Sequence, residues 1–268
     1  MLNIAAPGLI SNDSLFAAFQ ASIGIAVAAG AVVEFSEGRW AWRALGSRLT
    51  GSASPGSRER EHILEAFNRT SLVGRLALGV PLACGLGGPL AAWLAVLLLT
   101  VALRLRFKHN MLYITLCAIV VAATETGRYA ASASAEVPLW GPLSVLVLVF
   151  GLYLNGAWWK LKSVQFRSGA TIYIILESFR HRRIGKVVNL LHTQVSPKNV
   201  RMSCRIAAAA VIGVEASLPV AFMIPALTYP GMAIGILLHA AFLIVQPGRL
   251  LPFQIAVVGS YACVDIVL

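Results

Sequence analysis

Apolar residues recur along the chain in eight stretches of about 15 to 22 residues, separated by polar or charged segments. A helix needs about 20 apolar residues to cross a bilayer, so several stretches lie near the short limit. We therefore expect an all-α fold, a polytopic transmembrane helical bundle of about eight spans that forms a single membrane domain over residues 1–268. The stretches are Leu15–Val33, Thr70–Leu86, Pro89–Leu103, Met111–Glu125, Leu139–Trp158, Cys204–Pro225, Gly231–Gln246 and Phe253–Leu268.

Two long segments between these stretches combine basic residues with scattered apolar ones. Residues 34–69 begin with Phe35, Trp40 and Trp42 among arginines, a pattern typical of an amphipathic helix that lies in the membrane interface. Residues 159–203 have a mildly apolar middle part, 172–191, with a basic cluster at 180–186. That part fits a second interfacial helix that touches anionic headgroups, or an ordinary cytoplasmic loop.

Composition and charge support a membrane protein and give it an orientation. Hydrophobic residues make up 58% of the chain and charged residues 12%, and the mean hydropathy is +0.77. The net charge of +11 arises mostly from segments 34–69, 104–110, 159–203 and 247–252, which hold 19 of the 22 basic residues, with Arg205 just beyond the third segment. The positive-inside rule makes these loops cytoplasmic and the N-terminus external, in a multi-pass protein of the cell membrane. We expect the lipid bilayer as partner and no nucleic acid, since the basic residues are dispersed and lack a recognition module.

The sequence lacks the motifs of several common enzyme classes. The chain has no phosphate-binding loop of the G-x-x-x-x-G-K-[ST] type, no H-E-x-x-H, no G-x-S-x-G and no aspartate-rich metal motif. We therefore expect no metal site. The four cysteines form no C-x-x-C pair and lie in or at the ends of apolar stretches, so they are expected to be small buried hydrophobes.

Ionisable residues inside apolar stretches are costly, which makes each of them a candidate for function. Glu215 lies midway along the sixth stretch, four residues before Pro219, where the helix should bend. His239 lies in the seventh stretch at a depth that differs from that of Glu215 by roughly 3 Å. The two side chains are therefore expected to pair across neighbouring helices, as an intramembrane acid/base pair or as a structural hydrogen bond.

A second polar group is expected at the cytoplasmic ends of the fourth and fifth stretches. His109 and Asn110 begin one helix, Lys160 ends the next, and Asn155 lies a little over one turn deeper. Trp158 and Trp159 either anchor the span at the interface or wall a dry site in which Lys160 acts as a base. Lys160 alone also fits an interface lysine that reaches for water. Arg75, in the second stretch, either reaches the cytoplasmic surface or pairs with a carboxylate.

Three segments resemble one membrane protein superfamily. YLNGAWWKLKSVQFRSG, from Tyr153 to Gly169, resembles the pattern Y-x-x-A-G-x-x-K-L-x-x-x-W-x-x-G of the vitamin K-dependent gamma-carboxylase-like, or HTTM-domain, proteins. EASLP at 215–219 and GILLH at 235–239 resemble its E-x-x-x-P and G-x-x-x-H elements, which also occur in DoxX-like proteins. KHNMLY at 108–113 resembles its N-H-x-Y-L segment, with the order His-Asn here, and Phe166 stands where the pattern has tryptophan.

The resemblance implies a membrane enzyme that modifies a lipophilic small molecule or a peptide. Lys160 would then be the base, supported by His109 and by the pair Glu215 and His239. Substrate contacts would come from Asn110, Tyr153, Asn155 and Trp159. The cofactor is left open, with a quinone as the candidate. Two other functions remain: a DoxX-like, quinone-linked redox component of the membrane, and a carrier or immunity-type protein without catalysis.

Overall fold

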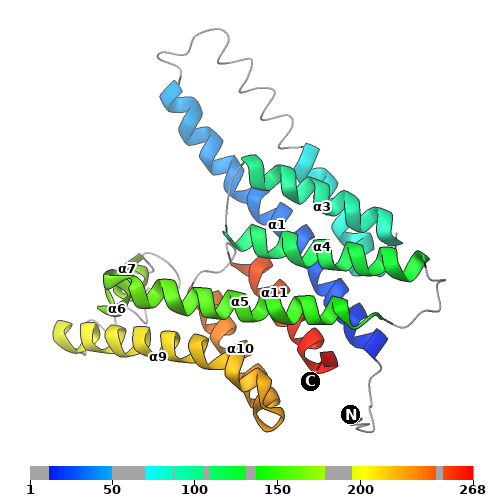
Figure 1. Cartoon of the computed structure of the whole chain (residues 1–268). Helices are drawn as coiled ribbons and strands as arrows, with labels where there is room; N and C mark the ends of the chain where they lie inside the picture. Colours follow the sequence, from blue (N-terminus) through cyan, green and yellow to red (C-terminus); the bar gives the residue numbers. More distant parts are fainter. Residues whose placement is uncertain are drawn as a thin grey trace. The chain divides into compact units, whose positions relative to one another are not determined.

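The structure is a computed structural model that describes residues 12–49, 70–86, 88–105, 109–130, 137–178, 195–245 and 250–267. Within these ranges the chain is helical and contains no strand, which confirms the expected all-α class (Figure 1). The helices are α1 (Asn12–Leu49), a helix over Thr70–Ala83, α3 (Gly88–Leu105), α4 (His109–Ala130), α5 (Trp140–Lys162), α6 (Val164–Arg167), α7 (Ala170–Ser178), α9 (Pro197–Met223), α10 (Pro225–Val245) and α11 (Leu251–Val267).

Each of the eight apolar stretches coincides with a helix. Five of these helices are long and apolar enough to cross a membrane: the part of α1 over Asp13–Ser36, α4 from Asn110, α5, α9, and α10 to Ile244. The helices over Thr70–Ala83, Gly88–Leu103 and Leu251–Val267 are apolar but shorter. The count of eight spans therefore rests on three helices that are short for a bilayer.

The predicted loop boundaries need correction. The helix α1 runs without a break to Leu49, so residues 34–49 continue the first helix instead of starting a loop. Lys160 belongs to α5, which ends at Lys162, and α9 begins at Pro197, so the predicted loop 159–203 is shorter at both ends. The proposed interfacial helix over 172–191 is seen only as its beginning, in α7, and residues 179–194 lie outside the described ranges.

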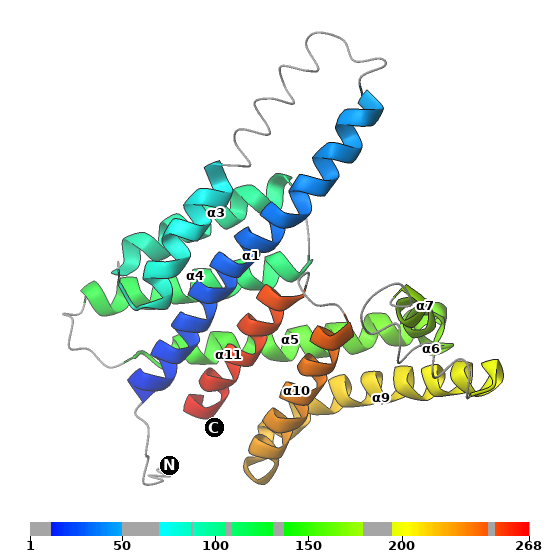
Figure 2. The same ribbon diagram turned by 180° about the vertical axis from the view of Figure 1, so that it is seen from behind.

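The contacts among the helices divide the chain into two compact units. Unit 1 comprises Met1–Leu148 and Gly248–Val267, and unit 2 comprises Val149–Pro247 with Leu268. In unit 1, α1 packs along α11 and α3 packs along α4; Figure 2 shows both pairs from behind. In unit 2, α9 packs against α10 and α7.

Small residues let helices of unit 1 approach closely. A Cβ added at Gly24 would lie 2.3 Å from the backbone nitrogen of Ala83, and one added at Gly79 would lie 2.8 Å from the nitrogen of Ala28. The first helix therefore touches the helix over Thr70–Ala83 backbone to backbone. A Cβ at Gly259 would likewise clash with the side chain of Ser22, where α11 meets α1. Such contacts are how apolar helices associate where lipid supplies no hydrophobic driving force.

Hydroxyl groups within the apolar helices bond to their own backbone. The Oγ1 atoms of Thr100, Thr115 and Thr126 donate to carbonyl oxygens four residues earlier, at 2.8, 2.8 and 2.7 Å. Ser144 and Ser260 do the same at 2.8 and 2.7 Å. A hydroxyl that is satisfied inside its own helix needs no water, so these residues are compatible with hydrocarbon surroundings.

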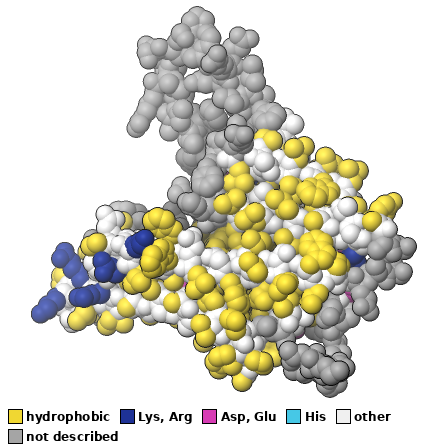
Figure 3. Space-filling view, in the orientation of Figure 1, with side chains coloured by type: hydrophobic (Ala, Val, Ile, Leu, Met, Phe, Trp, Pro, Cys, Tyr) yellow, Lys and Arg dark blue, Asp and Glu magenta, His cyan; other side chains and the backbone are white. Residues whose placement is uncertain are grey.

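Much of the apolar surface of these helices faces outward. Only 28% of the apolar window of α9 and 22% of that of α10 is buried inside the protein. Hydrophobic side chains are spread over much of the described surface in Figure 3. Exposed apolar surface on this scale requires an apolar environment, so the helices indicate association with a lipid bilayer.

Candidate functional site

Three residues of α5 lie on the same face of that helix, in the part of α5 that belongs to unit 2. Tyr153, Gly156 and Lys160 are spaced by three and four positions, which brings their side chains one above another along an α-helix. Tyr153 is buried, whereas Lys160 keeps part of its side chain accessible. This face meets polar side chains from both α9 and α10.

Lys160 forms an ion pair with Glu215 of α9. Its Nζ atom lies 2.5 Å from both carboxylate oxygens and donates to each. The side chain of Glu215 is 7% exposed and that of Lys160 is 25% exposed, so the carboxylate is enclosed and the amine is reachable from one side. A Cβ added at Gly156 would lie 3.2 Å from Oε2 of Glu215. The absence of a side chain at this position therefore leaves room for the carboxylate against α5.

Aromatic rings flank the amine of Lys160. Its Nζ atom lies 5.8 Å from the ring centroid of Phe166 in α6 and 5.9 Å from that of Phe242 in α10. These distances allow a favourable cation–π interaction while the rings keep water away from one side of the ion pair. Phe166 thus supplies an aromatic ring beside the amine.

Tyr153 and His239 form a second polar contact. The hydroxyl of Tyr153 and Nε2 of His239 are 2.6 Å apart, and both residues are buried, at 2% and 3% exposure. Which of the two donates depends on the tautomer of the imidazole. The ring of Phe222 in α9 lies tilted beside that of Tyr153, with centroids 6.3 Å apart, and the ring of Phe242 stands edge-on to that of His239 at 6.2 Å.

The predicted partners of Glu215 and His239 were wrong. Among the residues that the structure describes, Glu215 has Lys160 as its ion-pair partner, and His239 bonds to Tyr153. Both partners come from α5, so one helix supplies a group to each of the two residues that were expected to pair directly. Phe242 touches both contacts, because its ring faces Lys160 and also lies against His239. Lys160, Glu215, Tyr153, His239 and Phe242 are called the α5 polar cluster below.

Other predicted site residues lie outside the α5 polar cluster. Asn155 is exposed, and Trp159 is 64% exposed. The amine of the neighbouring Lys162 lies 4.4 Å from the ring centroid of Trp158, so these tryptophans interact with an outward-facing lysine. The position of His109 in α4 is described, but its side chain is not.

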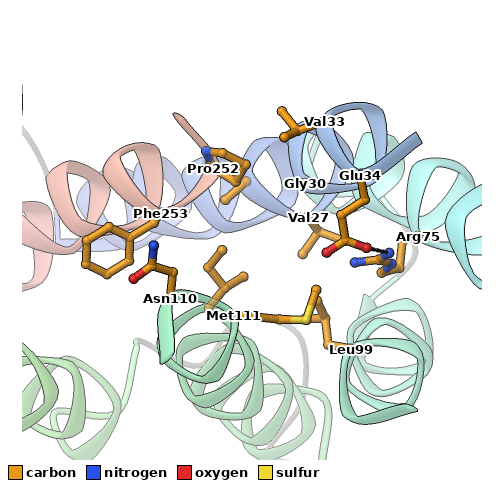
Figure 4. A pocket seen from close by; sticks show the side chains of 12 residues that line it. Val27, Gly30, Val33, Glu34, Arg75, Leu99, Asn110, Met111, Pro252 and Phe253 are labelled. Atoms are coloured by element: carbon orange, nitrogen blue, oxygen red, sulfur yellow. Dashed lines mark hydrogen bonds and ion pairs between the residues drawn. The ribbon is translucent and has the colours of Figure 1, made fainter. Parts of the chain in front are cut away.

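Asn110 belongs to a pocket in unit 1 (Figure 4). There the guanidinium of Arg75 donates to Oε2 of Glu34 at 2.6 Å, with Arg75 fully buried and Glu34 at 8% exposure. Arg75 therefore pairs with a carboxylate, one of the two alternatives that its sequence position left open. The Nε atom of Arg75 is buried without a hydrogen-bond partner. Apolar residues such as Leu99, Met111 and Phe253 complete the lining of a cavity of about 50 Å³.

Cysteines and possible metal ligands add little to either site. Cys117, Cys204 and Cys263 are buried as expected, but Cys84 is exposed in the turn after the helix over Thr70–Ala83, which contradicts the expectation for that residue. In the part of the chain that the structure describes, no three histidine, cysteine or acidic residues come together as a metal-binding group.

The α5 polar cluster combines an amine, a carboxylate, an imidazole and a phenol within helices that are otherwise apolar. Sequence reasoning found four of its members but missed Phe242 and the neighbouring Phe222. The spacing of seven from Glu215 to Phe222, and of three from His239 to Phe242, places each ring on the same helix face as the polar residue. That spacing was the feature of the sequence from which the two phenylalanines could have been predicted. No protein-family model, curated protein or solved structure matches the chain.

Proposed function

We propose that the protein is an integral membrane enzyme of the carboxylase-like, HTTM type, which modifies a lipophilic small molecule or a peptide within the bilayer. The α5 polar cluster is its reaction centre, with Lys160 as the base. The observation that carries this proposal is the enclosed ion pair in which Nζ of Lys160 lies 2.5 Å from both oxygens of Glu215.

Glu215 supplies what a lysine base requires, which is a group that takes up the proton of the ammonium. Transfer of one proton from Lys160 to Glu215 would leave a neutral amine with a free lone pair, and the pair as a whole keeps zero net charge. The aromatic rings around the amine exclude water, so a substrate that approaches the accessible side of Lys160 meets the base without competing solvent. The protonated Glu215 is then the group that returns the proton.

The contact between Tyr153 and His239 provides a second place for a proton in the same unit. A phenol and an imidazole 2.6 Å apart can exchange a proton or share it with a developing negative charge. Their near-complete burial holds both rings in fixed orientation. We assign this contact the role of orienting or protonating the substrate, with Lys160 as the group that abstracts a proton from it.

The experiment compares two neighbouring lysines. Cells that produce the protein, Lys160→Gln or Lys162→Gln are analysed by untargeted mass spectrometry of their lipids, small molecules and peptides. Lys162 is the matched control, since its exposed side chain lies over Trp158 and takes no part in the ion pair. We expect a product that is present with the wild type and with Lys162→Gln, and reduced about 100-fold or more with Lys160→Gln and Glu215→Gln.

A charge exchange separates chemistry from folding. The double variant Lys160→Glu with Glu215→Lys restores opposite charges across the same gap but moves the amine to α9. We expect it to restore the level of protein in the membrane and not the product. Recovery of the product in the exchanged variant, or an unchanged product in Lys160→Gln, would assign the ion pair a purely structural role. A compound that accumulates unmodified with the wild type would instead indicate a carrier.

We also propose an eight-span topology with the N-terminus outside. Its support is the distribution of basic residues, of which 19 of 22 lie in the four segments assigned to the cytoplasm. The three shorter helices can cross the bilayer if the membrane thins locally or if their flanking residues reach the interface. In this topology Lys160, near the end of α5, lies toward the cytoplasmic side.

A further inference from the structure

A groove in unit 2 is distinct from the α5 polar cluster. It lies between α7, which contributes Ile172 and Leu176, and the beginning of α9, which contributes Val200, Cys204 and Ala207. Its volume is about 220 Å³, and Ser203 is the lining residue with a polar side chain. Apolar cavities of about 150 Å³ stay dry and take up apolar molecules. The groove therefore favours hydrocarbon over water.

A tight turn holds the two walls of the groove together. Gly169, between α6 and α7, has a φ of 76°, which is the left-handed region where glycine is favoured. A Cβ added there would lie 2.5 Å from the backbone nitrogen of Arg205. The turn that precedes α7 therefore rests directly on the backbone of α9. The groove is a consequence of this fixed contact and of the small side chain at Ala207.

Exposed cations lie on the helix that forms one wall of the groove. Lys198, Arg201 and Arg205 are exposed in the first turns of α9. The guanidinium of Arg201 lies 5.9 Å from the ring of Tyr173, so this arginine reaches across to α7. Glu177 is the acidic residue among the described residues of α6, α7 and this part of α9. Figure 3 shows the lysine and arginine side chains gathered at this end of α9.

We propose that this groove binds an anionic phospholipid, with one acyl chain between α7 and α9 and the phosphate on Arg201 and Arg205. Apolar walls match the chain, and the positive rim matches the charge of the headgroup. Large apolar residues next to the rim, Met202 and Ile206, are 57% and 63% exposed and face the surrounding acyl chains. A peptide fits this groove poorly, because its backbone would need polar partners that the apolar walls lack.

Cys204 makes the occupancy of the groove measurable. It lines the groove and is 4% exposed, so an acyl chain beside it shields the thiol from a membrane-permeant maleimide. The purified protein is placed in phosphatidylcholine vesicles with and without phosphatidylglycerol, and alkylation of Cys204 is followed by peptide mass spectrometry. The exposed Cys84 serves as the internal reference for reagent activity. We expect phosphatidylglycerol to slow the alkylation of Cys204 relative to that of Cys84.

Two sets of variants test the rim and the wall separately. Arg201→Gln and Arg205→Gln should each weaken the effect of phosphatidylglycerol about fivefold, since each cation near an anionic surface contributes about that factor to binding. Arg167→Gln is the matched control, because this exposed arginine belongs to α6, outside the two helices that form the groove, and it should leave the effect unchanged. Ala207→Phe fills the groove and should reduce the phosphatidylglycerol retained in native mass spectrometry.

Three results would overturn the proposal. The first is equal alkylation of Cys204 with and without phosphatidylglycerol. The second is protection that persists in the double variant of Arg201 and Arg205, which would assign the groove to any acyl chain. The third is full protection in lipid-free detergent, which would mean that the protein alone closes off Cys204 and leaves no room for an acyl chain beside it. None of these measurements depends on the activity proposed for Lys160.

Discussion

Replacement of Arg75 by methionine removes one partner of the ion pair in unit 1. Its guanidinium is fully buried and lies 2.6 Å from a carboxylate oxygen of Glu34, which is 8% exposed. Methionine has a similar length and fills much of the same space, so the main change is the loss of charge. Glu34 would then be a buried carboxylate without its cation, next to an apolar pocket.

The expected cost follows from this burial. Removal of one partner from a buried ion pair lowers the free energy of unfolding by about 3–5 kcal/mol, because the remaining charge stays desolvated. The double variant Arg75→Met with Glu34→Met leaves no charge behind. Its free energy of unfolding is expected to return to within about 1 kcal/mol of the wild type, or to exceed it. The double variant should therefore cost far less than the sum of the two single substitutions, which is the sign of a direct interaction between the two side chains.

The assay is equilibrium unfolding in mixed micelles of a mild detergent and sodium dodecyl sulfate, followed by circular dichroism. Glu125→Gln is the control, since Glu125 pairs with Arg128 at 3.4 Å and both side chains keep contact with the surroundings. This control should cost less than about 1 kcal/mol. A single Arg75→Met variant as stable as the double variant would refute the reasoning, because it would mean that Glu34 needs no partner.

Three further predictions follow from single residues. Gly24→Ala should lower the free energy of unfolding by about 1–3 kcal/mol or more, because the added Cβ meets backbone atoms. Gly213→Ala, with open space around the added Cβ, should raise the free energy of unfolding by about 0.5–1 kcal/mol in the same assay. Cys84 should react with a membrane-impermeant maleimide in intact cells and not in inside-out vesicles, and the reverse result would contradict the proposed orientation. Tyr153→Phe removes the hydroxyl 2.6 Å from His239 and should lower the free energy of unfolding by about 1 kcal/mol. It should also reduce product formation at an unchanged level of protein in the membrane. Full product formation would exclude Tyr153 from the reaction centre.

The positions of the helices were predictable because hydrophobicity along the chain reports directly on length and burial. All eight apolar stretches became helices, including the short one over Thr70–Ala83. Helix ends were less predictable, as α1 shows. The sequence of its charged second half predicts a separate interfacial segment, but the helix continues through this half to Leu49.

The partners within the α5 polar cluster were harder to predict for a geometric reason. Distance along a helix gives the depth of a residue, so Glu215 and His239 were correctly expected to be buried. The direction in which a side chain points changes by about 100° per residue, and depth carries no information about which neighbouring helix lies in that direction. Lys160 added a second difficulty, because its long side chain brings the amine to Glu215 from a backbone position that was assigned to the interface.

The buried guanidinium of Arg75 also bears on how the chain enters the membrane during synthesis. The helix that covers Thr70–Ala83 within the described residues carries an arginine, which costs about 2.5–3.5 kcal/mol at the centre of a span. It is therefore a poor candidate for insertion on its own. Glu34 on the preceding helix provides the compensating charge, and Gly24 and Gly79 allow the two helices to touch. The first two apolar segments should therefore be integrated as a hairpin. A reporter fused after Ala83 would give the native orientation only when α1 is present.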